Sequence, residues 1–314
     1  MKKYYVGIDG GGTYTKAVVV SESGELVLRV GGETINYCAV SFDTARKNLE
    51  TVFDKISESV DQNDISRVFI GCSALESRAD AETVKKLMGR YSHLPTDMDS
   101  DLFVALYGHS FGKAGAMLIS GTGSMGVAQT EDGSVITCGG WGYVFGDEGS
   151  AYHIATEGLR HVSKMADGRE KKTPLYFAAL KYYGVNDPYE IIDKIYLSEF
   201  SRKKIAEFAT VVSECAECDT CCVLILDNAA CALYETARTL LKKAKISDSL
   251  AVYGGVLLNN ERILSTLNEL LLTDFPDITV SFPEALPEFG AVAAAMDKDG
   301  VLSEEIKEKL CALK

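Results

Sequence analysis

Two glycine- and threonine-rich segments contain residues that could bind a phosphate chain. The first is Asp9–Lys16, which follows the apolar residues Val6–Ile8, and the second is Ser120–Ser124, which follows Met117–Ile119. Glycines let backbone N–H groups approach an anion closely, and threonine and serine hydroxyls add further donors. Two such turns can hold one phosphate chain from both sides, so ATP is the first ligand to consider.

The two segments also share their surroundings, because each turn joins two apolar strands and is followed by a third. We expect the third strands at Leu26–Val30 and Val135–Thr137. A Gly-Gly pair then closes each unit, at Gly31-Gly32 and Gly139-Gly140. This repetition favours a phosphate cradle over two unrelated tight turns.

Composition and charge exclude several classes of protein. The chain has 314 residues with 46% hydrophobic content, which is enough for two domains, each with its own core. The net charge is -13, and no cluster of lysine and arginine is long enough to bind nucleic acid. No apolar run approaches the roughly 18 residues of a membrane span, and Met1–Lys3 leads into a strand without a signal-peptide pattern. We therefore expect a cytoplasmic protein that binds neither membrane nor nucleic acid.

Strands alternate with helices along the chain, which is typical of the α/β class with mixed sheets. The expected later strands are Val68–Cys72, Leu250–Tyr253 and Ile278–Phe282. The expected helices are Ser41–Ser59, Asp80–Tyr91, Leu102–Tyr107, Ala151–Ala166, Pro174–Tyr183, Pro188–Tyr196, Ser201–Cys215, Thr220–Ala244, Glu261–Leu272, Ala291–Met296 and Ser303–Leu313. The small residues of Ala291–Met296 predict a helix that packs close to another backbone.

The order and spacing of the motifs resemble the sugar kinase/actin/Hsp70 superfamily, and more narrowly the N-acetylglucosamine kinase branch of the BadF/BadG/BcrA/BcrD ATPase family. The resemblance covers nearly the whole chain, and no Walker A loop is present. The segments that carry it are Asp9–Lys16, Ile119–Ser124, Gly139–Gly142, Gly146–Ser150 and Gly254-Gly255.

The resemblance implies two actin-like (ribonuclease H-like) domains with mixed sheets flanked by helices, and an active site in the cleft between them. The N-terminal domain would span residues 1–111 and be completed by the C-terminal segment 285–314. The C-terminal domain would span residues 112–284. A homodimer is the family expectation.

The resemblance also assigns the nucleotide site. Gly11, Gly12 and Thr13 would hold the β- and γ-phosphates, and Thr122 with Gly123 would close from the other side. Lys16 would add positive charge or point to solvent. Asp9 would hold Mg²⁺ directly or through water, because Mg²⁺ keeps several waters in proteins. The adenosine would lie against Gly254 and Gly255.

The catalytic base is expected among three aspartates. In similar kinases an aspartate opens a helix and accepts the proton of the sugar hydroxyl, which matches Asp101 before Leu102–Ala105. Asp99 is the second candidate and Asp97 the third. Either of these two could instead cap the helix, as aspartate often does.

The sugar site is expected around Gly140–Gly142 and Asp147. A carboxylate can accept hydrogen bonds from two sugar hydroxyls, and glycines let backbone groups reach the ring. Glu148 would orient Asp147, bind the sugar or be solvated. The ring of Trp141 is expected to pack in the core. By resemblance the sugar-contacting residues are Asn36, Asp101, Ser124, Gly140, Trp141, Gly142 and Asp147.

Four cysteines, Cys215, Cys218, Cys221 and Cys222, raise the possibility of a metal site. On a single helix the first two and Cys222 would share a face. The activator branch of the same family carries an iron–sulfur cluster, but its ligand cysteines lie in different loops and it lacks the Gly-Gly-Trp-Gly and Gly-Asp-Glu-Gly-Ser segments. We therefore expect reduced thiols, and we expect the four histidines to be surface or core residues.

The sequence thus predicts an ATP- and Mg²⁺-dependent kinase that phosphorylates the 6-hydroxyl of a small amino sugar. N-acetylglucosamine is the first candidate, with N-acetylmuramic acid and glucosamine as alternatives. A cluster-carrying ATPase activator of a 2-hydroxyacyl-CoA dehydratase-type enzyme, and a non-catalytic sugar sensor, are the other classes considered.

Overall fold

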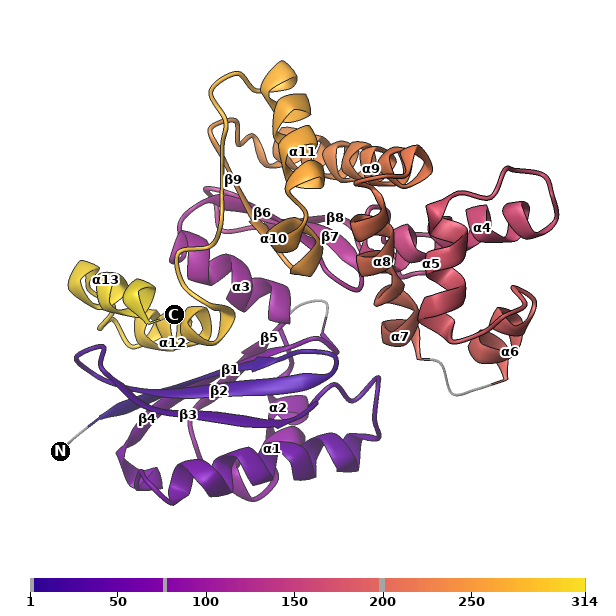
Figure 1. Cartoon of the computed structure of the whole chain (residues 1–314). Coiled ribbons are helices and arrows are strands. Elements are labelled where there is room, and N and C mark those ends of the chain that lie inside the picture. Colours follow the sequence, from indigo (N-terminus) through magenta and orange to yellow (C-terminus); the bar gives the residue numbers. More distant parts are fainter. Residues whose placement is uncertain (1–2, 76–77, 198–200, 314) are drawn as a thin grey trace. The chain divides into compact units, whose positions relative to one another are not determined.

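The computed structural model describes residues 3–75, 78–197 and 201–313 of the chain (Figure 1). Met1 and Lys2, which precede the expected first strand, lie outside the described residues. The chain divides into two compact units. Unit 1 comprises Met1–Ala114 and Pro283–Lys314, and unit 2 comprises Gly115–Phe282.

Unit 1 is built on a five-stranded mixed sheet with the strand order β3-β2-β1-β4-β5. Strand β2 runs antiparallel to its neighbours β1 and β3, whereas β4 and β5 run parallel to β1. The bounds are β1 Tyr4–Gly10, β2 Tyr14–Ser21, β3 Leu26–Glu33, β4 Ile65–Cys72 and β5 Thr96–Asp99.

Helices cover both faces of this sheet, as Figure 1 shows. Alternate residues of β1 serve the two faces, since Val6 and Ile8 join the core with α1 and Tyr5 joins the core with α12. The bounds are α1 Phe42–Ser57, α2 Ala81–Met88, α3 Asp101–Ser110, α12 Pro287–Lys298 and α13 Glu304–Ala312, with 3-10 turns η1 Gln62–Asp64 and η2 Gly89–Tyr91.

Helix α12 packs with its backbone almost directly on β1 and α3. A Cβ atom at Gly7 of β1 would lie 2.1 Å from the carbonyl oxygen of Glu288, and one at Gly290 would lie 2.1 Å from the carbonyl oxygen of Val104 in α3. Just before α12, the amide of Ala285 donates a hydrogen bond to the carbonyl of Gly108 in α3, at 2.9 Å. The close approach predicted from the small residues of this segment is therefore confirmed.

Unit 2 repeats the strand arrangement of unit 1. Its sheet has the order β10-β9-β6-β7-β8, in which β6, β7 and β8 are antiparallel and β9 and β10 are parallel to β6. The bounds are β6 Gly115–Ser120, β7 Ser124–Gln129, β8 Val135–Gly139, β9 Ser249–Tyr253 and β10 Thr279–Ser281. The α/β class with mixed sheets, predicted from the alternation of strands and helices, is confirmed.

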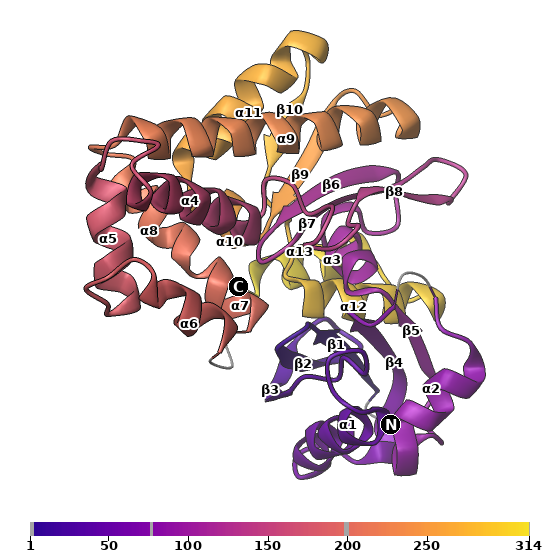
Figure 2. The same cartoon turned by 90° about the vertical axis from the view of Figure 1, so that its right-hand side faces the viewer.

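The helices of unit 2 are grouped around a single core that includes β6 and α9 (Figure 2). Their bounds are α4 Ala151–Ala166, α5 Pro174–Tyr183, α6 Glu190–Tyr196, α7 Arg202–Ala206, α8 Phe208–Cys215, α9 Thr220–Ala244, α10 Gly255–Asn259 and α11 Glu261–Asp274. By length and composition alone, α9 could cross a membrane, contrary to the sequence expectation. Ten of its residues are buried, and they pack in the core of unit 2, so we interpret α9 as a core helix.

Several sequence expectations need correction. Gly31 and Gly32 do not close the first hairpin unit but lie within β3, where Gly31 leaves room for the hydroxyl of Tyr14. The expected helix Ser201–Cys215 is two helices, α7 and α8, and both β5 and α10 were missed. Cys215 ends α8, whereas Cys222 lies in α9 after the cap residue Asp219, so the cysteines do not share one helix face.

We expect the substitution Gly290→Ala to destabilise unit 1 by about 1–3 kcal/mol, because the new methyl group would force α12 away from α3. The matched control is Glu308→Ala on the exposed side of α13, which should change the free energy of unfolding by at most about 0.5 kcal/mol. Urea denaturation of the variants measures both values. Equal stability of Gly290→Ala and the control would show that this close packing does not limit stability.

Candidate active site

In unit 1, two candidate carboxylates meet at one edge of the sheet. Asp9 lies near the end of β1, where it pairs with Lys16 of β2 on one side and with Gly71 of β4 on the other. Asp101 is the first residue of α3, and a Cβ atom at Gly71 would lie 3.2 Å from its Cα atom. The glycine in β4 therefore lets the start of α3 come close to Asp9.

Both carboxyl groups have pKa values near neutrality. Burial raises the pKa of Asp9 to about 7, helped by the negative charges of Asp101 and Glu288 and opposed by Lys16. Burial likewise raises the pKa of Asp101 to about 6, against hydrogen bonds from the backbone at the start of α3. A carboxylate in this range can both accept and release a proton at physiological pH.

Glu288 of α12 is a member of this group that the sequence reasoning missed. Its side chain is buried, and its Oε2 atom has no hydrogen-bond partner among the described residues. When buried carboxyl groups lie close together, ionising all of them at once is unfavourable unless a cation compensates their negative charge. The arrangement is thus suited to a divalent cation held at Asp9.

The structure separates the roles of the three aspartates around α3. Ser100, and neither Asp97 nor Asp99, is the N-cap, and its side chain accepts a hydrogen bond from the amide of Phe103. Asp97 is bound by three cations, Arg67, Arg78 and Lys298. An aspartate neutralised in this way is a poor base.

Asp99 accepts a hydrogen bond from the amide of Ser100 at 2.7 Å, and burial raises its pKa. Among the described residues, Asp101 has hydrogen bonds only from the backbone at the start of α3, and burial raises its pKa. Asp101 therefore stays the preferred candidate for the base, with Asp99 as the alternative.

The glycine turn after β1 is fixed from both sides and open at its tip. The Oγ1 atom of Thr34 donates to the carbonyl of Gly11 at 2.8 Å, and the amide of Ser73 donates to the carbonyl of Gly10 at 2.9 Å. Gly12 and Thr13 at the tip are exposed, and so is Lys16. This geometry suits a phosphate-binding turn, and the assignment of these residues remains a prediction.

Asn36 has a structural role in the same region. Its Nδ2 atom donates to the Oγ of Ser73 at 2.9 Å, while its Oδ1 atom accepts from the amides of Cys38 and Ala39. The sugar contact expected for Asn36 remains a prediction. Ser73, which follows β4, was not singled out from the sequence because an isolated serine carries no motif.

In unit 2, the second glycine turn is tied to the start of α4. The amide of Gly121 donates to the carbonyl of Gly123 at 2.9 Å, and the amide of Ala151 donates to the carbonyl of Gly121 at 2.8 Å. Ser120 and Ser124 donate their hydroxyls to the carbonyls of Gly149 and Glu148. The turn and the loop before α4 therefore form one fixed structure.

A cavity of about 560 Å³ joins this turn to the Gly-Gly pair after β9. Gly121 and Thr122 line it from one side, and Gly255 and Val256 from another. Gly254 has a φ of 99°, and a Cβ atom there would lie 2.4 Å from the carbonyl oxygen of Ser120, so only glycine permits this approach. The size falls within the usual range for small-molecule sites.

Residues of α4, α7, α8 and α10 complete the lining of the cavity. They were missed in the sequence because their spacing follows no known motif, and they include Lys203 of α7, Thr210 and Ser213 of α8, Asn259 of α10 and the cap residue Asn260. The structure thus brings together the phosphate-binding and adenosine-binding candidates of unit 2.

Asp147 is buried beside the same turn and is held by Arg202 of α7, with 2.5 Å between the guanidinium and the carboxylate. A Cβ atom at Gly123 would lie within 3 Å of both side chains. Burial raises the pKa of Asp147, and the charge of Arg202 opposes this effect. Arg202 was missed from the sequence because it lies 55 residues from its partner.

The ring of Trp141 is not in the core, contrary to the expectation, because the residue is 71% exposed. Gly140 and Gly142 on either side have positive φ values, and the amide of Gly146 donates to the carbonyl of Gly142 at 2.8 Å. This turn directs the Trp141 side chain outward, with its ring centroid 6.5 Å from that of Phe145. Glu148 is also exposed.

Comparison with known proteins identifies the family. A model described as the BadF/BadG/BcrA/BcrD ATPase family matches residues 6–296. The chain belongs to this ATPase family. The resemblance carried by the glycine motifs is thereby confirmed, and ATP is the nucleotide that the family uses.

Within this ATPase family the similar proteins include sugar kinases. An N-acetyl-D-glucosamine kinase of Dictyostelium discoideum is 29% identical, with 94% of this chain and 98% of the relative covered. An N-acetylmuramic acid/N-acetylglucosamine kinase of Clostridium acetobutylicum is 25% identical, with 93% and 98% covered. The crystal structure of a candidate N-acetylglucosamine kinase from Chromobacterium violaceum has a TM-score of 0.71 at 23% identity, with 96% and 99% covered. The fold is thus the two-domain, actin-like fold of sugar kinases.

The pKa values at the edge of the unit 1 sheet can be tested without an activity assay. In a pH titration followed by carboxyl carbon NMR, we expect Asp9 to titrate near pH 7 and Asp101 near pH 6. Asp101→Asn removes a neighbouring negative charge and should lower the pKa of Asp9. An unchanged Asp9 pKa in this variant would contradict the proximity of the two groups, and Asp61→Asn, at an exposed cap of η1, is the control.

Proposed function

We propose that the chain transfers the γ-phosphate of ATP to the 6-hydroxyl of an amino sugar, most simply N-acetylglucosamine. The observation that carries the proposal is the pair of raised-pKa carboxyls, Asp9 and Asp101, at the edge of the unit 1 sheet. The two full-length relatives, which are named as kinases of N-acetylglucosamine and of N-acetylmuramic acid, support the choice of acceptor.

Each group of residues has a role in this proposal. Asp101 accepts the proton of the sugar hydroxyl as that oxygen attacks the γ-phosphorus. The turn Gly11–Thr13 and the turn residues Thr122 and Gly123 donate hydrogen bonds to the phosphates, and Lys16 adds positive charge. The cavity at Gly254 and Gly255 receives the adenosine.

Mg²⁺ is part of the proposal, and the residues present fit it. Bound to the phosphates, this ion would neutralise the charge that develops on the transferred group. Asp9 would hold it, directly or through water, because its buried carboxylate lies among negative charges that a cation would compensate. The positive charge of Lys16 balances part of this negative charge, and the cation would balance the rest.

The sugar is proposed to bind around Asp147 and the turn Gly140–Gly142, and Asn36 and Ser124 are proposed as further sugar contacts. Arg202 orients the Asp147 carboxylate, which can then accept hydrogen bonds from hydroxyls through its second oxygen. The exposed ring of Trp141 is available to cover an apolar face of the sugar or its acetyl group. N-acetylmuramic acid and glucosamine remain the alternative acceptors.

The proposal also covers the location and partners of the enzyme. We propose that it is cytoplasmic, since ATP and salvaged cell-wall sugars are both available there. We further propose that it acts as a homodimer without membrane or nucleic-acid partners. The ATPase-activator alternative is less supported, because the relatives that match over nearly their whole length are named as kinases.

The proposal is tested by coupled ADP release with ATP and Mg²⁺ against N-acetylglucosamine, N-acetylmuramic acid, glucosamine, N-acetylmannosamine and glucose. We expect turnover on one or two N-acetylated sugars. Asp101→Asn should lower kcat by about 10²-fold or more, the size usual for loss of a general base. Sugar binding, measured by calorimetry, should change little.

The matched variant is Asp99→Asn, which should keep most of the activity. The opposite result, loss in Asp99→Asn with activity retained in Asp101→Asn, would move the base to Asp99. ADP release that ignores every sugar would contradict the kinase proposal and favour the ATPase-activator alternative.

A further inference from the structure

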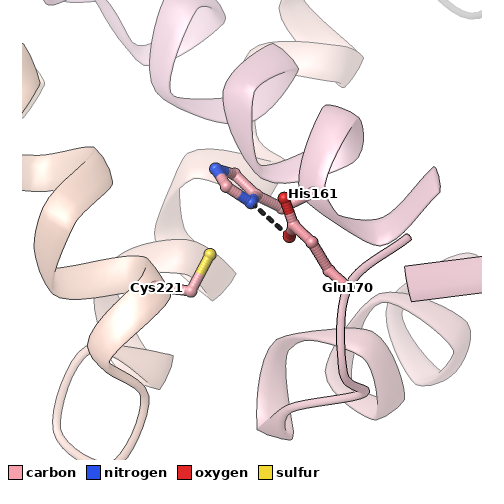
Figure 3. A group of neighbouring side chains, drawn as sticks. All are labelled: His161, Glu170 and Cys221. Carbon is pink, nitrogen blue, oxygen red and sulfur yellow. Dashed lines mark hydrogen bonds and ion pairs between the residues drawn. The ribbon is translucent and has the colours of Figure 1, made fainter. Parts of the chain in front are cut away.

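Three side chains of different chemistry converge in unit 2, away from the residues assigned above. They are His161 of α4, Glu170 in the segment between α4 and α5, and Cys221 in the first turn of α9. One ligand atom from each lies within 4.8 Å of the other two. Figure 3 shows the imidazole between the carboxylate and the thiol, with all three directed toward one another.

The backbone around the three residues is fixed by hydrogen bonds. The amides of Arg169 and Glu170 donate to the carbonyl of Lys164, at 2.8 and 3.1 Å, which folds the segment back onto α4. Asp219 accepts from the amide of Cys221 at 2.9 Å and from the amide of Leu175 at 2.9 Å. The start of α9 is thereby joined to the start of α5, so the three side chains are held on rigid supports.

We propose that His161, Glu170 and Cys221 form a zinc-binding site. Imidazole nitrogen, carboxylate oxygen and thiolate sulfur are the ligands that Zn²⁺ takes in proteins, whereas Mg²⁺ and Ca²⁺ prefer oxygen alone. The thiolate and the carboxylate together would balance the charge of the ion. Three protein ligands leave a fourth position for water, and all three residues are half-buried, so solvent can reach it.

The distances require only small movements. Tetrahedral zinc separates its nitrogen, oxygen and sulfur ligands by about 3.4–3.6 Å, given the usual metal–ligand lengths. The Nδ1 atom of His161 now lies 2.7 Å from the Oε2 atom of Glu170, so this pair would open by less than about 1 Å. The sulfur of Cys221 lies within 4.8 Å of the other two ligand atoms, so it would close by at most about 1.4 Å.

One charge opposes the ion. The ammonium group of Lys164 lies 3.2 Å from the Oε1 atom of Glu170 and would repel Zn²⁺. Its side chain is 38% exposed and can turn into solvent, where ammonium groups are well hydrated. Replacing Lys164 with glutamine should therefore tighten zinc binding severalfold.

A metal at this place would link three elements of unit 2. It would join α4, the segment leading to α5, and the start of α9, which are otherwise connected by hydrogen bonds and core packing. His161 lies ten residues, or about 15 Å, along α4 from Ala151, which contacts the glycine turn at Gly121. The proposed zinc would thus lie on the helix that supports this turn, and it does not depend on the proposed kinase reaction.

The test uses the full-length protein with Zn²⁺ and with Co²⁺ as a spectroscopic probe. After removal of metal with a chelator and dialysis against Zn²⁺, elemental analysis should find one zinc per chain, and zinc should raise the melting temperature. Co²⁺ should give a thiolate-to-cobalt charge-transfer band with intense tetrahedral d–d bands. Cys221→Ser and His161→Gln should each lower zinc affinity at least tenfold. Cys221→Ser should also remove the charge-transfer band, and His161→Gln should remove the tetrahedral d–d bands.

The matched control is Cys218→Ser, which alters an exposed cysteine three residues from Cys221 that is not part of the group. It should bind zinc and cobalt as the unaltered protein does. Circular dichroism of the metal-free variants establishes that each is folded. Failure to bind zinc at micromolar concentration, unchanged affinity in Cys221→Ser and His161→Gln, or equal loss in Cys218→Ser would each overturn the proposal.

Discussion

The close packing of α12 on β1 and α3 is the constraint on which the candidate active site depends. Gly7, Gly290 and Gly108 let three backbones approach to distances that any side chain would prevent. Because α12 lies so close, it brings Glu288 to the edge of the sheet where Asp9 and Asp101 lie, and the three carboxyls share a region poor in solvent. The raised pKa values of Asp9 and Asp101 follow from this burial, with added repulsion at Asp9.

A comparable constraint operates in unit 2, where the backbone at Gly254 lies against Ser120. This contact places the end of β9 beside the end of β6, so the turn at Gly121 and the Gly-Gly pair can line one cavity. The two units therefore share one sheet topology, and in each of them glycines permit a close approach of backbones beside the candidate site residues. Unit 1 brings carboxyl groups together, whereas unit 2 places a glycine turn beside a cavity whose lining includes Lys203 and Glu207.

Local patterns predicted much of the fold, because helix ends are encoded by nearby residues. The bounds of α4, α5 and α9 were anticipated, since Ser150 and Asp219 cap two of these helices and Pro174 opens the third. Strand β5 was missed because two of its four residues are aspartates, and the cations that neutralise Asp97 come from distant segments. The sequence also could not predict that Arg202 pairs with Asp147, because only the tertiary fold brings the two together. The same holds for the group formed by Cys221, His161 and Glu170.

The central claim, transfer of phosphate to the sugar 6-hydroxyl, is tested most directly by phosphorus NMR of the product formed from ATP and N-acetylglucosamine. A phosphate ester on the 6-hydroxyl couples to the two protons of that carbon and gives a triplet without proton decoupling. The account predicts this triplet, which should be absent with the 6-deoxy sugar. A doublet, which marks a ring or anomeric hydroxyl, or inorganic phosphate alone, would contradict it.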